Sequence, residues 1–506
     1  MGRKEEQMIK ELIENIQHGI QIRQNLILLR KEIQDENQKR ALAYLLGGEY
    51  DLFAELLDNE DAKVRKNAAL ILGEMECEEM LPELVSAYER EQTLFVRPDF
   101  LKAIRSYEFL PYLSVLKERK AQIENMEEDT EGTKHLREEA ALLQKMIFMY
   151  EKPKKHTFTG IPSARSAEII LLTNRCQREA TRRQIEIEKV TMLAGGIRFY
   201  TNQIEKILKI RTWKEMLFPI PSISSLEGTP EEIGSILGAS KMIDFISSLH
   251  RGNEPFLFRV ELKSNMPLEK KGTWIRKMAA KLETASGRRW KNSPEEYEIE
   301  IRLIQTKEEK FIPLLRLYTI PDERFSYRKE YLPTSISPVN AALLMELGKE
   351  YLKENTQVLD PFCGVGTMLI ERNAAVKART MYGLDILEEA VEKARENTKR
   401  AGLPIHYINR NFFDFEHEYL FDEIVTNLPG KSKNRNEGQI AGLYQNFFEK
   451  AMTHLKDGGI LFLYTSEKAL IQKNCSRYPQ YHLRKEYLIN EKEKKSLFIL
   501  QMYRNR

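Results

Sequence analysis

A glycine turn that follows a short apolar segment is the part of this chain best suited to hold a ligand through its backbone. Val358 and Leu359 predict a buried apolar strand, and Asp360 stands at its carboxyl end. Gly364 and Gly366 allow the backbone conformations of a tight turn and close approach of a ligand, just before a segment that predicts a helix. A strand, an acidic residue and a glycine turn in this order are typical of a site for a nucleoside-bearing cofactor.

The alternative is a dinucleotide-binding fold, in which a third glycine brings a pyrophosphate onto a helix N-terminus. Leu369 occupies the third glycine position here, and this bulky residue argues against pyrophosphate. Asp360 instead suits a cofactor that carries a cationic amino-acid end.

A second acidic residue, Asp385, closes the apolar segment 381–384, 25 positions after Asp360 (385 − 360). A carboxylate at that place can accept both ribose hydroxyl protons. The pair predicts S-adenosylmethionine (S-adenosyl-L-methionine) as the cofactor. The other interpretation, two ordinary aspartates at strand ends, is disfavoured by the glycine spacing.

A third apolar strand, residues 421–427, ends in Asn427-Leu428-Pro429. An exocyclic base amine is a weak nucleophile, so acceptors must hold its N–H groups and aim the nitrogen lone pair at a methyl group. We expect the Asn427 side-chain oxygen and the Leu428 carbonyl to be these acceptors, with Pro429 in the same turn. No strong base is required, because the proton can leave as the C–N bond forms.

This turn resembles the Asn/Asp-Pro-Pro-aromatic signature of amino-group methyltransferases. The aromatic residue that usually follows the proline and stacks on the extruded base is missing, since Gly430 stands there. Either another ring stacks on the base, with Phe412, Phe413 and Tyr444 as candidates, or catalysis is weakened or lost. Pro429-Gly430 can also be a plain turn after a central strand.

The segment 331–344 contains Pro333-x-Ser335, then Pro338 and a run of small residues. Together with the motif at 360–367, it resembles the THUMP-containing RNA guanine-N2 methyltransferases, over about residues 156 to 506. The resemblance implies a C-terminal α/β, Rossmann-like methyltransferase domain with a seven-stranded sheet at residues 330–506. It also implies that the loop with Ser335 borders the methionine end of the cofactor, although a helix N-cap is an equal alternative.

The same resemblance indicates the other residues that contact the cofactor. A polar residue after the fourth strand contacts the adenine in that family, and Asn411 fits this place better than Asp414 does. A solvated loop is the alternative for both residues. The full set of predicted cofactor residues is Ser335, Asp360, Phe362, Gly364, Gly366, Thr367, Asp385, Ile386 and Asn411.

Residues 156–325 mix strand-like alternation with helices. The pattern predicts strands at 256–263 and 297–303, each with one buried face, and a helix at 274–282. This stretch resembles a ferredoxin-like half followed by a THUMP-like RNA-binding module, of α+β class. The basic stretch around the helix suits an RNA backbone, or else is a solvated helix face. The predicted RNA contacts are Lys270, Lys271, Lys277, Arg288 and Arg289.

Residues 1–150 predict only helices, in pairs that recur at offsets of 32 (96 − 64) and 29 (110 − 81) residues. They resemble HEAT repeats, which must stack to bury their faces and would bind a protein or RNA partner. A plain helical bundle is the alternative. The Glu- and Lys-rich segment 117–151 predicts one long solvated helix.

The composition bounds the remaining possibilities. A chain of 506 residues has room for three or four domains, and 42% hydrophobic with 31% charged residues is typical of soluble proteins. No apolar run approaches the ~20 residues that span a bilayer, so we expect a cytoplasmic protein without membrane contact. Four scattered cysteines and eight histidines show no metal-ligand spacing, and we predict no metal or disulfide.

These patterns together predict an S-adenosylmethionine-dependent RNA methyltransferase. The favoured product is N2-methylguanosine in tRNA, and ribosomal RNA is the second candidate substrate. The net charge of +3 does not by itself indicate a nucleic-acid partner, so the local basic cluster carries that prediction. The alternative class is an RNA-binding or assembly protein that keeps the cofactor fold but has lost transfer.

Overall fold

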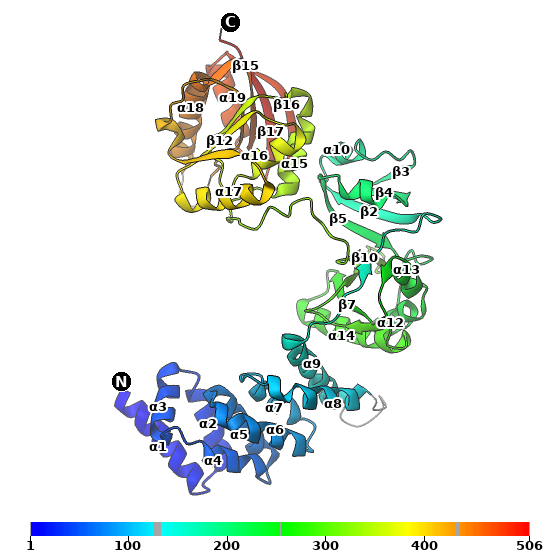
Figure 1. The fold of residues 1–506 in the computed structure, drawn as a ribbon, viewed down its shortest axis with the longest axis vertical. Helices are drawn as coiled ribbons and strands as arrows, with labels where there is room; N and C mark the ends of the chain where they lie inside the picture. The colour runs from blue at the N-terminus through cyan, green and yellow to red at the C-terminus, as the bar shows by residue number, and fades with distance from the viewer. Residues whose placement is uncertain (1, 125–132, 254, 432–435, 505–506) are drawn as a thin grey trace. The chain divides into compact units, whose positions relative to one another are not determined.

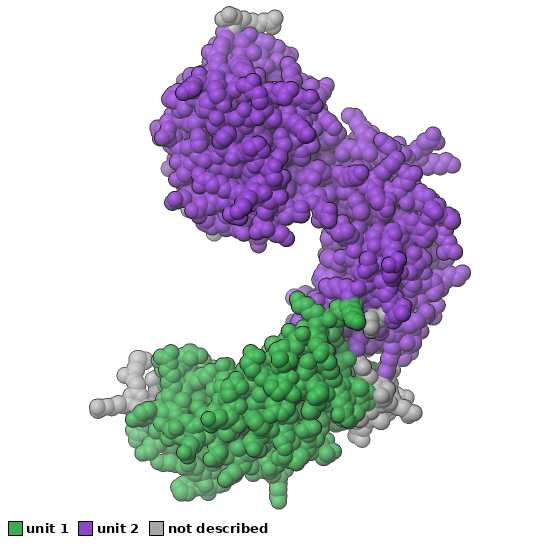
Figure 2. Space-filling model, viewed as in Figure 1, with its two compact units in different colours: residues 1–154 green, residues 155–506 purple. Residues whose placement is uncertain are grey.

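The computed structural model describes residues 2–124, 133–253, 255–431 and 436–504 (Figure 1). The chain divides into two compact units, residues 1–154 and 155–506 (Figure 2). Each unit has hydrophobic cores of its own. Within the described ranges, no helix is both long enough and apolar enough to span a bilayer.

The described part of the first unit is helical. Helix α5 begins after Asp61, because the Asp61 side chain accepts a hydrogen bond from the Lys63 N–H and caps the helix. Gly73 lets α5 pack closely on α7, since an added Cβ there would lie 2.6 Å from the Ala103 Cα. The helices are α1 (Gly2–Gln17), α2 (Ile22–Glu32), α3 (Glu36–Leu46), α4 (Asp51–Glu55), α5 (Ala62–Met75), α6 (Leu81–Arg90), α7 (Arg97–Ile104), α8 (Leu113–Glu124) and α9 (Thr133–Tyr150).

The prediction of one long solvated helix at residues 117–151 is wrong for the described residues. The structure has two helices there, α8 and α9, and residues 125–132 lie outside the described ranges. Leu143 and Met146 are fully buried, and so is Glu139, which two arginines hold in ion pairs. The segment contains many charged residues, but its apolar residues recur at helical spacing and form a stripe that faces the core.

The middle region, residues 156–325, contains an eight-stranded sheet with the order β3-β4-β2-β5-β10-β9-β7-β8, and β1 pairs with β6. Its strands are β1 (Thr157–Phe158), β2 (Ala167–Thr173), β3 (Val190–Leu193), β4 (Gly196–Thr201), β5 (Trp213–Pro219), β6 (His250–Arg251), β7 (Phe256–Lys263), β8 (Trp290–Asn292), β9 (Ile299–Gln305) and β10 (Phe311–Leu317). Its helices are α10 (Arg178–Arg182), α11 (Ile204–Leu208), α12 (Pro230–Ala239), α13 (Met242–Ser248) and α14 (Leu268–Ala285).

One strand of the middle region differs from the predicted half-buried pattern. In β9 the charged residues Glu300 and Arg302 are buried along with the apolar ones, and the strand begins at Ile299. Arg302 donates hydrogen bonds to Glu300 at 2.6 Å and to Glu215 of β5 at 2.5 Å. Paired charges can be buried where isolated ones cannot, so alternation alone misidentified this face as solvated.

The C-terminal region contains a seven-stranded sheet with the order β13-β12-β11-β14-β15-β17-β16. The first five strands of that order are parallel, and β17 runs antiparallel to both of its neighbours. The strands are β11 (Gln357–Asp360), β12 (Thr380–Asp385), β13 (Ile405–Asn409), β14 (Phe421–Asn427), β15 (Leu455–Thr465), β16 (Tyr481–Asn490) and β17 (Lys495–Met502).

Helices cover both faces of this sheet (Figure 1). Neighbouring residues of one strand alternate between two cores, as Val358 and Leu359 of β11 do. Side chains of α15, α16 and α17 join the core of Val358, and those of α18 and α19 join the other. The helices are α15 (Pro338–Leu347), α16 (Thr367–Ala375), α17 (Glu388–Ala401), α18 (Glu437–His454) and α19 (Lys468–Arg477).

Polar contacts join the middle region to the C-terminal region inside the second unit. Arg211 donates two hydrogen bonds, of 2.9 and 2.7 Å, to the fully buried carboxylate of Glu371 on α16. The Tyr327 hydroxyl donates to the same carboxylate at 2.7 Å. At a second contact, the Asn174 side chain donates to the Ile489 carbonyl at 2.9 Å.

Candidate functional site

Three polar residues lie at the carboxyl ends of neighbouring parallel strands of the C-terminal sheet. Asp360 ends β11, Asp385 ends β12 and Asn427 ends β14. The strand β11 lies between the other two, and the strand order reverses there, because the chain continues to β12 on one side and returns as β14 on the other. Ligands of open α/β sheets bind at such a switch point.

Asp360 is a buried residue, and the protein provides hydrogen-bond donors for only one of its two carboxylate oxygens. Its Oδ1 accepts a hydrogen bond from the Phe362 N–H at 3.1 Å, whereas Oδ2 has no partner among the described residues. Burial raises the pKa of Asp360 to about 7, against the lowering effects of the Thr426 hydroxyl and the Phe362 N–H and with a small contribution from the charge of Asp385. A buried, half-satisfied carboxyl of this kind fits a cationic amine of a ligand.

Gly364 and Asp385 form the next part of the site. Gly364 has a positive φ of 51°, and a Cβ added there would meet no atom within 4 Å, so its face is open to a ligand. The Gly364 N–H donates to Asp385 Oδ2 at 3.0 Å, and the Leu387 N–H donates to Oδ1 at 3.0 Å. Each oxygen keeps a lone pair for a hydroxyl donor such as a ribose. Ile386, beside them, is 61% exposed.

Gly366 is constrained by its packing as well as by its backbone conformation. Its φ is 82°, and a Cβ added there would lie 2.3 Å from the Tyr407 hydroxyl oxygen. The Tyr407 ring is buried, and its hydroxyl shares a hydrogen bond of 2.8 Å with Thr398. Glycine is therefore required at 366 by the backbone conformation and by Tyr407.

The two serines before α15 have separate roles. Ser337 is the N-cap of α15 and accepts from the Asn340 N–H at 3.3 Å. Ser335 is not a cap; its Oγ accepts from the Leu332 N–H at 3.0 Å and closes a turn. Thr367, the first residue of α16, is buried, and its hydroxyl accepts a hydrogen bond from Arg328.

Asn411 and Phe362 lie on the same edge of the sheet. Asn411 follows β13 and caps the short 3-10 turn η5 (Phe412–Asp414), since its Oδ1 accepts from the Phe413 N–H at 3.2 Å. Its Nδ2 has no partner in the described part of the chain, which leaves a donor for a ligand. The Phe362 ring packs 6.2 Å from the Phe412 ring, so its side chain supports the core while its N–H binds Asp360.

Asn427 presents a free amide at the end of β14. Its side chain is half-buried and makes no hydrogen bond to a described residue. The next residue, Leu428, is buried, and its N–H donates to the Tyr464 carbonyl at 3.0 Å, which fixes the backbone beside Asn427. Pro429 is half-buried. The amide is therefore held on a rigid strand end with its hydrogen-bonding groups unused.

Two of the three rings considered for base stacking have no free face. Phe412 and Tyr444 are 1% and 0% exposed, and the Tyr444 hydroxyl is hydrogen-bonded to Thr465 at 2.5 Å. Both rings belong to the core beneath α18 and therefore cannot stack on an extruded base without a rearrangement. Phe413, which is half-buried, is the one of the three with a partly accessible ring.

The predicted basic surface of α14 is partly neutralised. Lys277 lies 3.0 Å from Glu231 of α12, and Arg289 lies 4.0 Å from Asp244 of α13. Lys270 is exposed and Lys271 half-buried, and neither has an ion pair with a described residue. Arg288 is exposed, with a φ of 59°. The lysines at the start of α14 are thus the clearest cations for a phosphate backbone.

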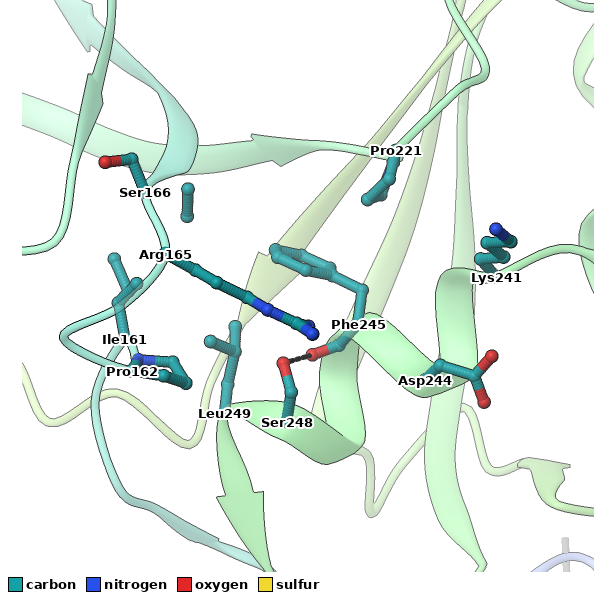
Figure 3. A pocket seen from close by; sticks show the side chains of 11 residues that line it. Ile161, Pro162, Arg165, Ser166, Pro221, Lys241, Asp244, Phe245, Ser248 and Leu249 are labelled. Carbon is teal, nitrogen blue, oxygen red and sulfur yellow. Dashed lines mark hydrogen bonds between the residues drawn. The ribbon is translucent and has the colours of Figure 1, made fainter.

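A cavity of about 210 Å³ in the middle region adds two basic residues that sequence analysis missed (Figure 3). Arg165 extends across it toward α13, and Lys241 lies at another part of its rim. The Phe245 ring and Leu249 supply apolar walls. Arg165 and Lys241 are far apart in sequence, so no local pattern could have joined them.

Among the described residues, no group of three His, Cys, Asp or Glu side chains could hold a metal ion.

Sequence reasoning also missed Arg328 and Asn397, which contact the loop around Gly364 from other elements. Asn397 is fully buried on α17 and bonds to the Val365 carbonyl at 3.2 Å. Arg328 bonds to Thr367. Neither residue belongs to a recognisable local motif, and only the folded chain brings them to the loop.

Comparisons with known proteins agree with this architecture. Residues 326–493 match the family profile of the RMKL-like methyltransferase domain UPF0020. A segment of 187 residues is 30% identical to the tRNA (guanine(10)-N2)-dimethyltransferase of Methanothermobacter thermautotrophicus, covering 35% of this chain and 54% of that protein. The chain thus spans about half the length of this relative. A segment of 149 residues is 26% identical to the uncharacterised protein YbxB of Bacillus subtilis, covering 28% of this chain and 71% of that protein.

Solved structures show the same fold at lower identity. TrmN from Thermus thermophilus is 21% identical, with a TM-score of 0.50, and the match covers 66% of this chain and 99% of TrmN. SMU.472, solved in complex with S-adenosylhomocysteine (SAH), is 16% identical, with a TM-score of 0.51, covering 68% of this chain and 99% of that one. The C-terminal region therefore has the Rossmann-like class I methyltransferase fold, which confirms the fold predicted for it.

Proposed function

We propose that this chain is an S-adenosylmethionine-dependent RNA methyltransferase that acts on guanine N2, with tRNA as the favoured substrate and ribosomal RNA as the second. The observation that carries the proposal is the unused amide of Asn427 beside Asp360 and Asp385, within residues that match a methyltransferase profile. The relative from Methanothermobacter thermautotrophicus is named a tRNA (guanine(10)-N2)-dimethyltransferase, and this name supports guanine N2 as the methyl acceptor and tRNA as the substrate.

The other regions have proposed roles in RNA binding. The middle region, residues 156–325, is proposed as a THUMP-like module, supported by its strand, basic helix and strand at β7, α14 and β8. Residues 1–150 are proposed as HEAT-like repeats that bind a protein or RNA partner, supported by their succession of packed helices. We place the protein in the cytoplasm, where its four cysteines, free in this structure, would remain reduced.

The residues at the strand ends fit S-adenosylmethionine. When bound, this cofactor supplies an electrophilic methyl group on a sulfonium. Asp360, with its unpartnered oxygen, would hold the cofactor's amine, and Asp385 would accept the ribose hydroxyl protons. Asn427 would accept an N–H of the base amine and turn the nitrogen lone pair toward the methyl group. Catalysis here is mainly positioning, because no side chain has to remove a proton before transfer.

The direct test uses the purified full chain with methyl-labelled S-adenosylmethionine and total RNA, followed by nucleoside analysis. We expect label in N2-methylguanosine, recovered from the tRNA fraction. Label only in ribosomal RNA would select the second substrate. The absence of an aromatic residue after Pro429 favours one other candidate function, an RNA-binding or assembly protein without transfer. SAH and RNA binding with no labelled nucleoside would establish that candidate.

The pKa of Asp360 predicts a pH-dependent affinity for SAH. With a pKa of about 7, the carboxyl is mostly protonated in acid, and only its ionised form attracts the ligand's amine. Affinity should therefore rise by about tenfold from about pH 6 to about pH 8, with a proton released on binding. Calorimetry in two buffers of different ionisation enthalpy measures that proton. An Asp360→Asn variant should bind more weakly and lose this pH dependence; a parent chain with flat affinity would contradict the prediction.

The lysines at the start of α14 predict a salt-dependent RNA affinity. A double variant, Lys270→Glu with Lys271→Glu, should weaken RNA binding and lower the slope of log affinity against log salt by about one per lost phosphate contact. A control with the same charge change, Lys399→Glu with Arg400→Glu at the end of α17, should leave the slope unchanged. Equal slopes in all three proteins would place the RNA on another surface.

A further inference from the structure

A short segment between the middle region and α15 is fixed against the loop at residues 364–366 of the proposed cofactor site, which we call the glycine loop. We call this segment, residues 327–336, the strap. It lies next to the loop because Asn397 bonds to both Glu330 of the strap and Val365 of the loop. The strap also contains Ser335, one of the predicted cofactor residues.

Arg328 fastens the strap at three points. Its Nε donates to the Glu330 carbonyl at 3.0 Å, and its Nη1 donates to the Ile336 carbonyl at 3.1 Å and to the Thr367 hydroxyl. The first two bonds close the strap on itself, and the third ties it to the first turn of α16. Burial lowers the pKa of Arg328, so these acceptors hold a partly desolvated cation.

Asn397 is the second fastening point, and it uses its full hydrogen-bonding capacity. Its Oδ1 accepts from the Lys329 and Glu330 N–H groups at 3.2 and 3.0 Å. Its Nδ2 donates to the Glu330 carbonyl at 2.9 Å and to the Val365 carbonyl at 3.2 Å. A fully satisfied buried amide holds its partners in one arrangement, and here it fixes Val365 between Gly364 and Gly366.

We infer that Arg328 and Asn397 are positioning residues of the cofactor site, which hold the strap and the glycine loop in the conformation that binds the cofactor. They act through backbone carbonyls and N–H groups of these two segments. A loop held by such a supporting layer has less freedom to lose when the ligand binds. The inference rests on the proposed function, since it concerns the same cofactor.

Arg324 provides a matched control in the same stretch of chain. It is buried, at 7% exposed, and it also donates to backbone carbonyls, those of Ile210 and Trp213 at 3.1 and 2.9 Å. It pairs with Asp322 at 2.7 Å. These contacts all lie on the side of the middle region, so losing Arg324 removes stability without releasing the glycine loop.

The experiment compares Arg328→Met, Asn397→Ala and Arg324→Met in the full chain, by SAH titration calorimetry and thermal unfolding. We expect Arg328→Met and Asn397→Ala to weaken SAH binding by about tenfold or more, as losses in a supporting layer do. Arg324→Met should lower the unfolding midpoint by a similar amount and change the affinity by less than about twofold. Arg328→Lys keeps the charge without the planar fork and should recover part of the affinity.

The outcomes separate this inference from the proposed function. If the parent chain binds no SAH, the proposed function fails and the inference fails with it. If the parent binds SAH and the Arg328 and Asn397 variants bind it equally well, the inference alone is overturned. It is also overturned if all three variants lose affinity in proportion to their unfolding midpoints. Should Arg328→Met fail to fold, Asn397→Ala and Arg328→Lys decide the same question.

Discussion

Replacing Asn427 by alanine should reduce methyl transfer by about 100-fold or more while SAH and RNA binding change little. The amide lies at the end of β14 without a hydrogen-bond partner among the described residues, so its removal leaves the fold unchanged. The acceptor acts mainly when the amine lone pair is aimed at the methyl group, and its loss therefore lowers turnover rather than affinity. Single-turnover transfer at saturating cofactor and RNA measures this effect.

The conservative variant Asn427→Asp sharpens that measurement. It keeps an acceptor oxygen at the same strand end, so it should retain more turnover than the alanine variant. If the parent methylates RNA and Asn427→Ala does so at a similar rate, the base amine is oriented by another group. The position of Leu428, whose N–H is fixed to Tyr464, makes its carbonyl the first group to examine in that case.

Replacing Asp385 by alanine should weaken SAH binding by roughly tenfold to hundredfold, which corresponds to about 1.5–3 kcal/mol for a charged hydrogen bond. The structure gives this residue two tasks, since it also accepts the N–H groups of Gly364 and Leu387. Its loss removes the ribose acceptor and releases the glycine loop together. Calorimetry with SAH measures the combined effect.

Asp414 supplies the control for Asp385. It is an exposed carboxylate that follows β13, at the same edge of the sheet, and it was the weaker candidate for the adenine contact. Asp414→Ala should leave SAH affinity unchanged. An equal loss in both variants would mean that the measurement reports negative charge at this edge and not a specific acceptor on β12.

The sequence located the strand-end residues because local patterns determine them. Asp360 and Asp385 each directly follow apolar residues, Asn427 follows Ile424-Val425-Thr426, and the structure places each of the three at the carboxyl end of a parallel strand. Parallel strands of a covered sheet are mostly apolar on both faces, so a polar residue directly after their apolar centre is a signal of the strand end. The turn at Gly364 could be predicted for the same reason, because positive φ favours glycine.

Features that depend on distant partners could not be predicted in this way. Gly366 is required by Tyr407, which comes from strand β13, and the burial of Glu300 depends in part on Arg259, which comes from the neighbouring strand β7. Phe412 and Tyr444 have the composition of stacking residues, but they point into the core. The burial and the contacts of each of these residues depend on which helices and strands pack together. Hydrophobic periodicity along one segment does not show which other segments pack against it.

The ion pair between Arg211 and Glu371 has a consequence for how the second unit melts. Glu371 is fully buried on α16, and its cation comes from the middle region. Separating the two regions would break this ion pair, whose arginine side chain is 30% exposed, and would leave the Glu371 carboxylate with the Tyr327 hydroxyl as its remaining donor among these contacts. The middle and C-terminal regions are therefore expected to unfold in one cooperative transition, so that a destabilising change in either sheet lowers the thermal midpoint of both.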